Sequence, residues 1–218
     1  MLTEPLPRIG IMGGMFDPVH NGHLQLANRA RDLCALDTVK LIPVGRPVHR
    51  DESIADAAQR VAMLERASVP YSWLQVDARE VGIAAPSYTY DTALAIRGEN
   101  PDARLFLLLG LDAFIAFDSW HRWLDLLGLV HLLVAVRPGY SWQSCRLDRG
   151  FRQEVNARRV ASADAAAQYS AGKILLASLD LPDISSTQLR RMIRKGEDIS
   201  RLAPAEVAGY IAANKLYQ

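Results

Sequence analysis

The chain has few of the features that mark secreted or membrane-spanning proteins. Cys34 and Cys145 are the only cysteines among its 218 residues. Two thiols make neither a disulfide framework nor a structural zinc site, so we expect the reducing environment of the cytoplasm. The N-terminal segment has no basic stretch followed by an apolar one, so we expect no signal peptide. No apolar run approaches the ~18 residues that a membrane span needs.

An excess of either charge is also missing. Lys and Arg number 25, Asp and Glu number 24, and the formal net charge is +1. We therefore expect neither the basic field that attracts nucleic acid nor an acidic disordered tail. Hydrophobic residues make up 50% of the chain and charged residues 22%, an ordinary balance for a globular protein. The length favours a single domain over residues 1–218, with a core over 8–180 and a C-terminal helical part over 184–216.

Short apolar runs recur along the chain and predict strands. Most of them are continuously apolar rather than alternating, which is typical of strands that are covered on both faces. The predicted strands are 8–12, 38–44, 73–76, 103–109, 131–136 and 173–178.

Helical patterns lie between these runs. We expect Asn21 to cap the first helix and Pro204 to lie in the first turn of the last one. The longest loops are expected at 86–90 and 137–145. Because strand and helix alternate, we predict an α/β fold, a doubly wound, Rossmann-like parallel sheet of about six strands with C-terminal helices. The predicted helices are 21–34, 54–67, 88–97, 111–127 (as two short helices), 145–168, 186–195 and 204–214.

The stretch GGMFDPVHNGH, residues 13–23, follows the first predicted strand and has the composition of a phosphate site. In an open parallel sheet, ligands bind beyond the carboxyl ends of the strands. Gly13 and Gly14 let a ligand approach the backbone, and the helix that follows offers free N–H groups and a positive dipole end. His20 and His23 flank the start of that helix, where their imidazole N–H groups can point at the same anion.

Several alternatives to this phosphate site differ in how well they agree with the sequence. The dinucleotide fingerprint GxGxxG and the P-loop GxxxxGK are both missing from the chain, which weakens hydride transfer and P-loop chemistry. Zinc needs three or four ligands, and His49, His121 and His131 are scattered, which disfavours a structural zinc site. Two ordinary surface histidines on a turn would show the same spacing.

Two stretches together resemble a known superfamily. GGMFDPVHNGH resembles the His-x-Gly-His signature of the nucleotidyltransferases, and ISSTQLR, residues 184–190, resembles their second element, which opens a late helix. Further stretches resemble one member family, the nicotinate mononucleotide adenylyltransferases of bacterial NAD synthesis. These stretches are IPVGRPVHR (42–50), PSYTYDT (86–92), LGLDAFIAFDSWHRW (109–123) and VRPG (136–139).

The resemblance implies an activity. Members of that family transfer AMP from ATP to nicotinic acid mononucleotide, with Mg²⁺, and release nicotinic acid adenine dinucleotide and pyrophosphate. The mononucleotide phosphate attacks in line, without a covalent enzyme intermediate. Such chemistry relies on positioning and charge stabilisation. The implied partners are therefore small molecules, without nucleic acid or membrane, and Mg²⁺ is expected to arrive with ATP rather than on protein ligands.

Three rival functions fit the same motifs. An amide-preferring enzyme would use nicotinamide mononucleotide, and a phosphopantetheine adenylyltransferase would serve coenzyme A. A nucleotide-binding module that has lost the chemistry is a rival of another class. Met15 favours it, because the family usually has Ser or Thr there, whereas the intact histidines argue against it. The sequence leaves open whether the protein forms a homo-oligomer.

The resemblance assigns the reacting phosphates of ATP to five side chains. His20 and His23 would hydrogen-bond the α-phosphate and the bridging oxygen as negative charge develops. Ser186 and Thr187 would receive the β- and γ-phosphates at a helix start. Arg190, one turn later, would face the same anion as a fork. A plain helix cap and a solvated arginine are the structural alternatives for the second motif.

Further ATP contacts follow from the same resemblance. The backbone at Gly13 and Gly14 would hold phosphates, and Gly110 and Asp112 would lie against the nucleotide, with Asp112 on its ribose. As an alternative, Asp112 could simply cap the helix that begins there. Asp17 we expect to be mainly structural, in a turn that Pro18 fixes.

The second substrate is assigned to another set of residues. Trp120 would stack on the pyridine ring and Thr89 would help to hold its carboxylate. Arg137 would meet the mononucleotide phosphate, while His49 and Arg50 would reach phosphates from the loop after the second strand. Trp120 could instead be a core aromatic residue, because Trp123 is its near neighbour.

Overall fold

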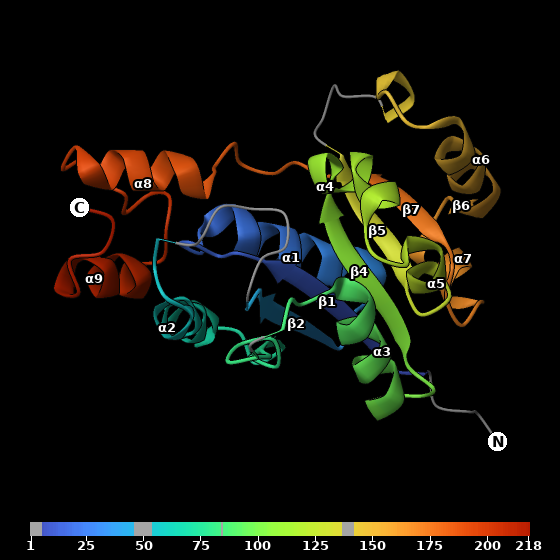
Figure 1. Ribbon diagram of the computed structural model, residues 1–218, viewed down its shortest axis with the longest axis horizontal. Helices are drawn as coiled ribbons and strands as arrows, with labels where there is room; N and C mark the ends of the chain where they lie inside the picture. Colours follow the sequence, from blue (N-terminus) through green and yellow to red (C-terminus); the bar gives the residue numbers. More distant parts are fainter. Residues whose placement is uncertain (1–5, 46–53, 84, 137–141) are drawn as a thin grey trace. The chain divides into compact units, whose positions relative to one another are not determined.

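The computed structural model describes residues 6–45, 54–83, 85–136 and 142–218. His49, Arg50 and Arg137 lie outside these residues. Within them the chain forms a seven-stranded sheet flanked by helices, with the strand order β3-β2-β1-β4-β5-β7-β6 (Figure 1). The strands are β1 (Arg8–Gly14), β2 (Thr38–Pro43), β3 (Leu74–Val76), β4 (Arg104–Gly110), β5 (His131–Val136), β6 (Arg159–Val160) and β7 (Ile174–Ser178).

The predicted α/β fold with a parallel sheet is confirmed. β1 with β4, β4 with β5, β5 with β7 and β6 with β7 all pair in parallel. The strand order reverses between β1 and β4, and such a switch point is where open α/β sheets bind their ligands. The helices are α1 (Asn21–Cys34), α2 (Ala57–Ser68), α3 (Thr89–Glu99), α4 (Leu111–Ile115), α5 (Trp123–Leu127), α6 (Arg149–Arg158), α7 (Ala163–Ala167), α8 (Ser186–Arg194) and α9 (Ala205–Ala213), with short 3-10 turns η1 (Phe117–Ser119) and η2 (Trp142–Ser144).

The prediction of one helix over 145–168 is wrong. That region divides into α6, the two-residue strand β6 and α7. Asp148 begins α6 by accepting hydrogen bonds from the Gly150 and Phe151 N–H groups, and Ser162 begins α7 by accepting from the Ala165 N–H. Each cap fixes a new helix start, and the extended residues between them add the seventh strand beside β7.

The contacts divide the chain into two compact units. The first unit comprises Met1–Met12, Arg29–Val39 and Tyr88–Asp180, and the second comprises Gly13–Asn28, Lys40–Ser87 and Leu181–Gln218. Among the described residues, no helix combines the length and the apolar character needed to cross a membrane.

The core of the first unit is built on β4 and β5. Every residue of β5 is buried, and so are Leu105 to Leu109 of β4, which explains their continuous apolar character. His131, the one histidine in β5, is also fully buried. Its Nδ1 accepts a 3.2 Å hydrogen bond from the Lys173 N–H, and its Nε2–H donates to the Tyr169 carbonyl at 3.1 Å. Burial lowers the pKa of His131 to about 4, so the ring is neutral at pH 7.

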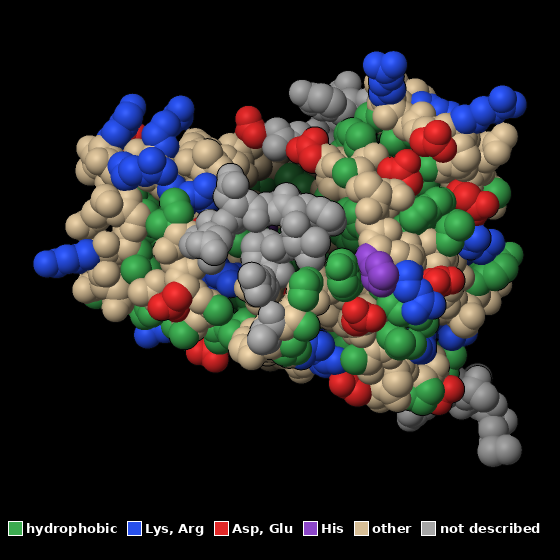
Figure 2. Space-filling view, viewed as in Figure 1, with side chains coloured by type: hydrophobic (Ala, Val, Ile, Leu, Met, Phe, Trp, Pro, Cys, Tyr) green, Lys and Arg blue, Asp and Glu red, His purple; other side chains and the backbone are tan. Residues whose placement is uncertain are grey.

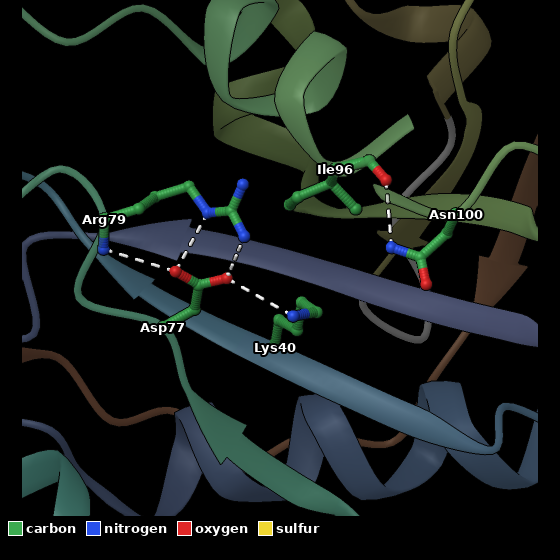
Figure 3. A network of polar contacts seen from close by, with 5 residues as sticks. All are labelled: Lys40, Asp77, Arg79, Ile96 and Asn100. Atoms are coloured by element: carbon green, nitrogen blue, oxygen red, sulfur yellow. Dashed lines mark hydrogen bonds and ion pairs between the residues drawn. The ribbon is translucent and has the colours of Figure 1, made fainter. Parts of the chain in front are cut away.

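Arg97 of α3 ties the loops of the first unit together. Its Nη1 donates to the Ala103 carbonyl at 2.6 Å and its Nη2 to the Leu129 carbonyl at 2.8 Å. Longer bonds reach three more carbonyls, those of Asn100, Pro101 and Ser170. One guanidinium thus satisfies the carbonyls of three loops. Figure 3 shows how α3 ends, with the Asn100 side-chain amide donating to the Ile96 carbonyl at 3.0 Å.

The second unit contains α2 packed on α9. α2 begins in a capping box, in which the Asp56 carboxylate accepts the Gln59 N–H at 2.7 Å and the Gln59 side chain accepts the Asp56 N–H at 3.0 Å. The Arg66 guanidinium lies 4.3 Å from the centre of the Tyr210 ring on α9. This packing holds the C-terminal helix of the chain against the helix that follows β2.

A small ionic network supports β2 and β3 in the same unit (Figure 3). Asp77 accepts hydrogen bonds from Arg79 Nε at 2.9 Å and Nη2 at 2.7 Å, and Lys40 Nζ lies 3.4 Å from it. Burial alone would raise the pKa of Asp77, but the hydrogen bonds and charge of Arg79, with the charge of Lys40, outweigh it and lower that pKa.

Candidate active site

The first motif, residues 13–23, turns sharply between β1 and α1. Gly14 ends β1, Phe16 takes a positive φ of 49° with its ring buried, and α1 begins at Asn21. The turn brings the His20 and His23 rings together, stacked with centroids 3.7 Å apart, and the Phe16 ring meets His23 edge-on at 5.0 Å. The two histidines therefore form one pair, as the spacing predicts.

The hydrogen bonds of this pair define where one of its protons lies. The His20 backbone N–H donates to His23 Nδ1 at 3.2 Å, so the neutral His23 ring carries its proton on Nε2. Within the described structure, the buried Nδ1 of His20 has no hydrogen-bond partner. Burial lowers the pKa of His20 to about 4, and burial together with the proximity of His20 lowers the pKa of His23 well below 6.5. At pH 7 the pair offers neutral N–H donors.

The prediction that Asn21 caps α1 is wrong. Asn21 is the first residue of the helix, and the His20 carbonyl accepts the Leu24 N–H at 3.3 Å. The loop before α9 engages Asn21 instead, because its backbone N–H donates to the Leu202 carbonyl at 2.8 Å and its side-chain amide donates to the Arg201 carbonyl at 3.2 Å. The start of a helix exposes only N–H donors, and the side-chain N–H₂ group of Asn21 is a donor as well. This group therefore donates to a loop carbonyl and not to the helix start.

The second motif meets the first directly. Ser185 caps α8 by accepting the Gln188 N–H at 3.2 Å, and α8 begins at Ser186 as the sequence predicts. The Ser186 hydroxyl donates to the Pro18 carbonyl at 2.9 Å. Figure 1 shows α8 lying beside the start of α1. The structure therefore joins two motifs about 160 residues apart in the sequence.

The Arg190 side chain makes two hydrogen bonds within the protein. Its Nη1 donates to the Asp17 carbonyl at 2.6 Å, and its Nη2 donates to the Thr187 hydroxyl at 3.3 Å. Its Nε is buried without a partner in the described residues. One arm of the guanidinium thus holds the first motif in place. Thr187 is exposed, and it is orientated by this arginine.

Positive charge gathers around the second motif. Figure 2 shows Lys and Arg side chains over α8, and Arg191, Arg194 and Lys195 are all exposed there. At the C-terminal end of a helix they complement its dipole.

Sequence reasoning missed two residues that hold the first motif, Arg60 and Tyr217. Arg60 is only 1% exposed, and its Nη1 donates to the Met15 carbonyl at 3.0 Å. The Tyr217 hydroxyl donates to Asp17 Oδ1 at 2.6 Å. Asp17 is buried, in agreement with its predicted structural role. The sequence signal for Arg60 is a charged residue among the regularly spaced apolar residues of α2. No sequence pattern marks Tyr217.

The first unit contains the remaining described residues of the predicted site. β4 ends at Gly110, which is the N-cap of α4 without a side-chain cap bond. Asp112 lies in the first turn, exposed, so the alternative that it caps the helix is wrong. Trp120 is half-buried, with its ring 5.2 Å from that of Phe117. Thr89 is the first residue of α3 and is half-buried.

The first motif does not provide a set of protein ligands for Mg²⁺. The described residues contain no group of three or more His, Cys, Asp or Glu side chains that could hold a metal ion. Asp17, the one acid of the motif, accepts three hydrogen bonds, from Tyr217, Ile54 and Ala55. Its oxygens are thus committed to protein donors rather than to a cation.

The sequence profile of the cytidylyltransferase-like family matches residues 11–192, from β1 through both motifs. The chain therefore belongs to the cytidylyltransferase-like family, a class of nucleotidyltransferases. Within that class it groups with the nicotinate-nucleotide adenylyltransferases. A protein of Laribacter hongkongensis is 45% identical over 220 residues, covering 100% of this chain and 98% of its own, and is named probable nicotinate-nucleotide adenylyltransferase. A protein of Acidithiobacillus ferrooxidans with the same name is 40% identical, covering 95% of this chain and 94% of its own.

Solved structures share the fold. The nicotinic acid mononucleotide adenylyltransferase of Plasmodium falciparum, complexed with NaAD, superposes with a TM-score of 0.72 at 17% identity, covering 97% of both chains. The same enzyme complexed with APC gives a TM-score of 0.69 at 17% identity, again over 97% of both chains. At this identity the likeness concerns the arrangement of strands and helices.

Proposed function

We propose that this protein transfers AMP from ATP to nicotinic acid mononucleotide, giving nicotinic acid adenine dinucleotide and pyrophosphate for NAD synthesis. The observation that carries the proposal is the stacked pair of neutral histidines at the start of α1, on the same motif to which Ser186 is hydrogen-bonded at Pro18. The names of relatives that match over almost the whole chain support it.

The geometry suits stabilisation of charge rather than proton transfer. The mononucleotide phosphate attacks the α-phosphorus of ATP in line, and negative charge grows on the phosphate oxygens as pyrophosphate leaves. A neutral His23 with its proton on Nε2 donates a hydrogen bond to such an oxygen, and the His20 ring stacks on it at an interplanar angle of 25°. Donors of this kind, fixed before the reaction, lower the barrier because they need no reorganisation.

The other predicted residues that the structure describes keep the roles proposed for them. Ser186 and Thr187 are at the start of α8, where backbone N–H groups favour the β- and γ-phosphates. The exposed Asp112 is available to a ribose. Trp120 and Thr89, both half-buried, would meet the pyridine ring and its carboxylate. Mg²⁺ would neutralise the phosphate charge, held by ATP oxygens and water.

Pyrophosphate release tests the proposal. The protein is supplied with ATP and Mg²⁺, and nicotinic acid mononucleotide and its amide are offered in parallel. We expect rapid release with the acid and much slower release with the amide. Preference for the amide would overturn the substrate assignment. ATP binding without release on either substrate would mean a nucleotide-binding module without activity.

We also propose that the protein works in the cytoplasm. Cys34 is buried, and burial raises its pKa to about 12, so this thiol is unreactive. The low number of cysteines supports a cytoplasmic location. Light scattering measures whether the protein forms a homo-oligomer.

A further inference from the structure

Tyr217 lies next to the last residue of the described chain, yet it is held as firmly as a core residue. Its exposed fraction is 5%, and its hydroxyl donates a 2.6 Å hydrogen bond to Asp17 in the buried interior of the second unit. Its φ of 64° lies in the left-handed region, which aromatic residues rarely adopt. Such a conformation persists only where the surrounding structure imposes it, and it points to a function.

The Asp17 carboxylate that Tyr217 contacts joins two separate segments. Oδ1 accepts the Tyr217 hydroxyl and also the Ala55 N–H at 3.1 Å, while Oδ2 accepts the Ile54 N–H at 2.9 Å. Ile54 and Ala55 lead directly into the capping box of α2. This carboxylate therefore anchors the two residues that precede the capping box of α2.

α2 returns to the first motif through Arg60. This buried guanidinium donates to the Met15 carbonyl, two residues before Asp17. Arg190 donates to the Asp17 carbonyl from the other side. Hydrogen bonds thus fix the backbone just before His20. They join Tyr217 to Asp17, Asp17 to the residues before α2, and Arg60 of α2 to Met15.

We propose that Tyr217 is a positioning residue for adenylyl transfer, because its hydroxyl orients Asp17 and thereby fixes the backbone that places His20 and His23. Tyr217 acts through Asp17 and does not touch the substrate. The kinetic part of this inference rests on the proposed function. Its structural part, the ordering of residues 15–20, does not.

The kinetic test compares Tyr217→Phe with Tyr210→Phe. The first removes the hydroxyl that Asp17 accepts, whereas Tyr210 lies on α9 with its ring under Arg66. A displacement of about 1 Å at reacting groups can cost ~10²-fold in rate. We expect Tyr217→Phe to lower kcat by about tenfold with an unchanged KM for nicotinic acid mononucleotide, and Tyr210→Phe to leave both unchanged. Equal kcat values in Tyr217→Phe and the wild type would overturn the proposal.

Hydrogen exchange separates this inference from the proposed function. In Tyr217→Phe we expect faster exchange in peptides that contain Met15 to His20 and Ile54 to Ala55, with α3 and β5 unchanged. A uniform rise across all peptides would mean that Tyr217 only stabilises the fold, and would overturn the positioning role. If the wild type releases no pyrophosphate, the proposed function fails, while the exchange result still decides whether Tyr217 orders the motif.

A double variant checks that the effect passes through Asp17. Asp17→Ala removes both acceptor oxygens, so the Tyr217 hydroxyl and the Ile54 and Ala55 N–H groups all lose their partner. If Tyr217 acts through Asp17, adding Tyr217→Phe to Asp17→Ala lowers kcat no further. An additional tenfold loss in the double variant would show that Tyr217 acts by another route.

Discussion

Ser186 and Pro18 are 168 positions apart in the sequence, and the Ser186 hydroxyl donates a 2.9 Å hydrogen bond to the Pro18 carbonyl. The preceding residue, Ser185, uses its hydroxyl to cap α8. Adjacent serines thus have separate tasks, since one caps the helix and the other attaches the helix to the first motif. This division allows the two tasks to be measured independently.

Alanine substitutions at these serines should have different effects. Ser185→Ala removes a helix cap and should lower the free energy of unfolding by about 1 kcal/mol with little change in turnover. Ser186→Ala removes a bond of about 0.5–1.5 kcal/mol and also frees the Pro18 carbonyl, so turnover should fall as well. Urea denaturation and pyrophosphate release, measured on both variants, give the comparison. Equal turnover in the two variants would show that the hydrogen bond between the motifs does not affect catalysis.

His23 should be the residue most sensitive to substitution. His23→Ala removes the proposed Nε2–H donor and should reduce kcat by about 10²–10³-fold, as the loss of one oxyanion donor does. His23→Asn is the matched control, because its amide oxygen can still accept the His20 N–H but no donor reaches the Nε2 position. Equal losses in the two variants assign the effect to Nε2–H. Full activity in His23→Asn would assign it to the support of the His20 backbone instead.

Acid should destabilise the protein through its buried histidines. The pKa values of His20 and His131 are lowered by burial to about 4, below the ordinary 6.5. Between these values the unfolded chain binds protons that the folded chain does not, so the stabilisation is complete above pH 6.5 and is lost as the pH falls toward 4. Each histidine contributes at most about 1.4 kcal/mol per pH unit.

Urea midpoints at pH 7, 5.5 and 4.5 measure this effect. His131→Gln removes one of the titrating groups and should flatten the dependence, although it lowers stability at pH 7 because the Lys173 N–H loses its acceptor. An unchanged slope in this variant would mean that His131 is already protonated in the folded state.

Replacing Arg97 should lower the free energy of unfolding. Arg97→Ala leaves up to five carbonyls without their donor, and hydrogen bonds to a charged group are worth about 1.5–3 kcal/mol. We expect a loss of roughly 2–3 kcal/mol in the free energy of unfolding. Arg191→Ala, an exposed arginine on α8, is the control and should change it by less than about 0.5 kcal/mol. A similar loss in both variants would contradict the role of Arg97.

Strong apolar runs made most of the sheet predictable. The run 131–136 is observed as His131–Val136, and 103–109 is observed one residue later, as Arg104–Gly110. β6 could not be found in this way, because Arg159–Val160 is too short and too polar to show a period. Its existence depends on pairing with β7, which is a tertiary contact.

The candidate site was predictable where its residues are contiguous. The histidine pair and the start of α8 each occupy a few neighbouring positions, so spacing reveals them. Arg60 and Tyr217 reach the motif from distant segments, and their partners are a backbone carbonyl and a buried carboxylate. No local pattern encodes such a contact, which only the folded chain creates.

The contact between Asp17 and Tyr217 also sets an order of events during synthesis. The two residues are 200 positions apart. A ribosome that adds ~5–20 residues per second needs roughly 10–40 s to cover that distance. Throughout this interval the nascent chain carries a histidine pair whose supporting backbone is incomplete. The nascent chain therefore cannot complete the support of its histidine pair until Tyr217 has been synthesised.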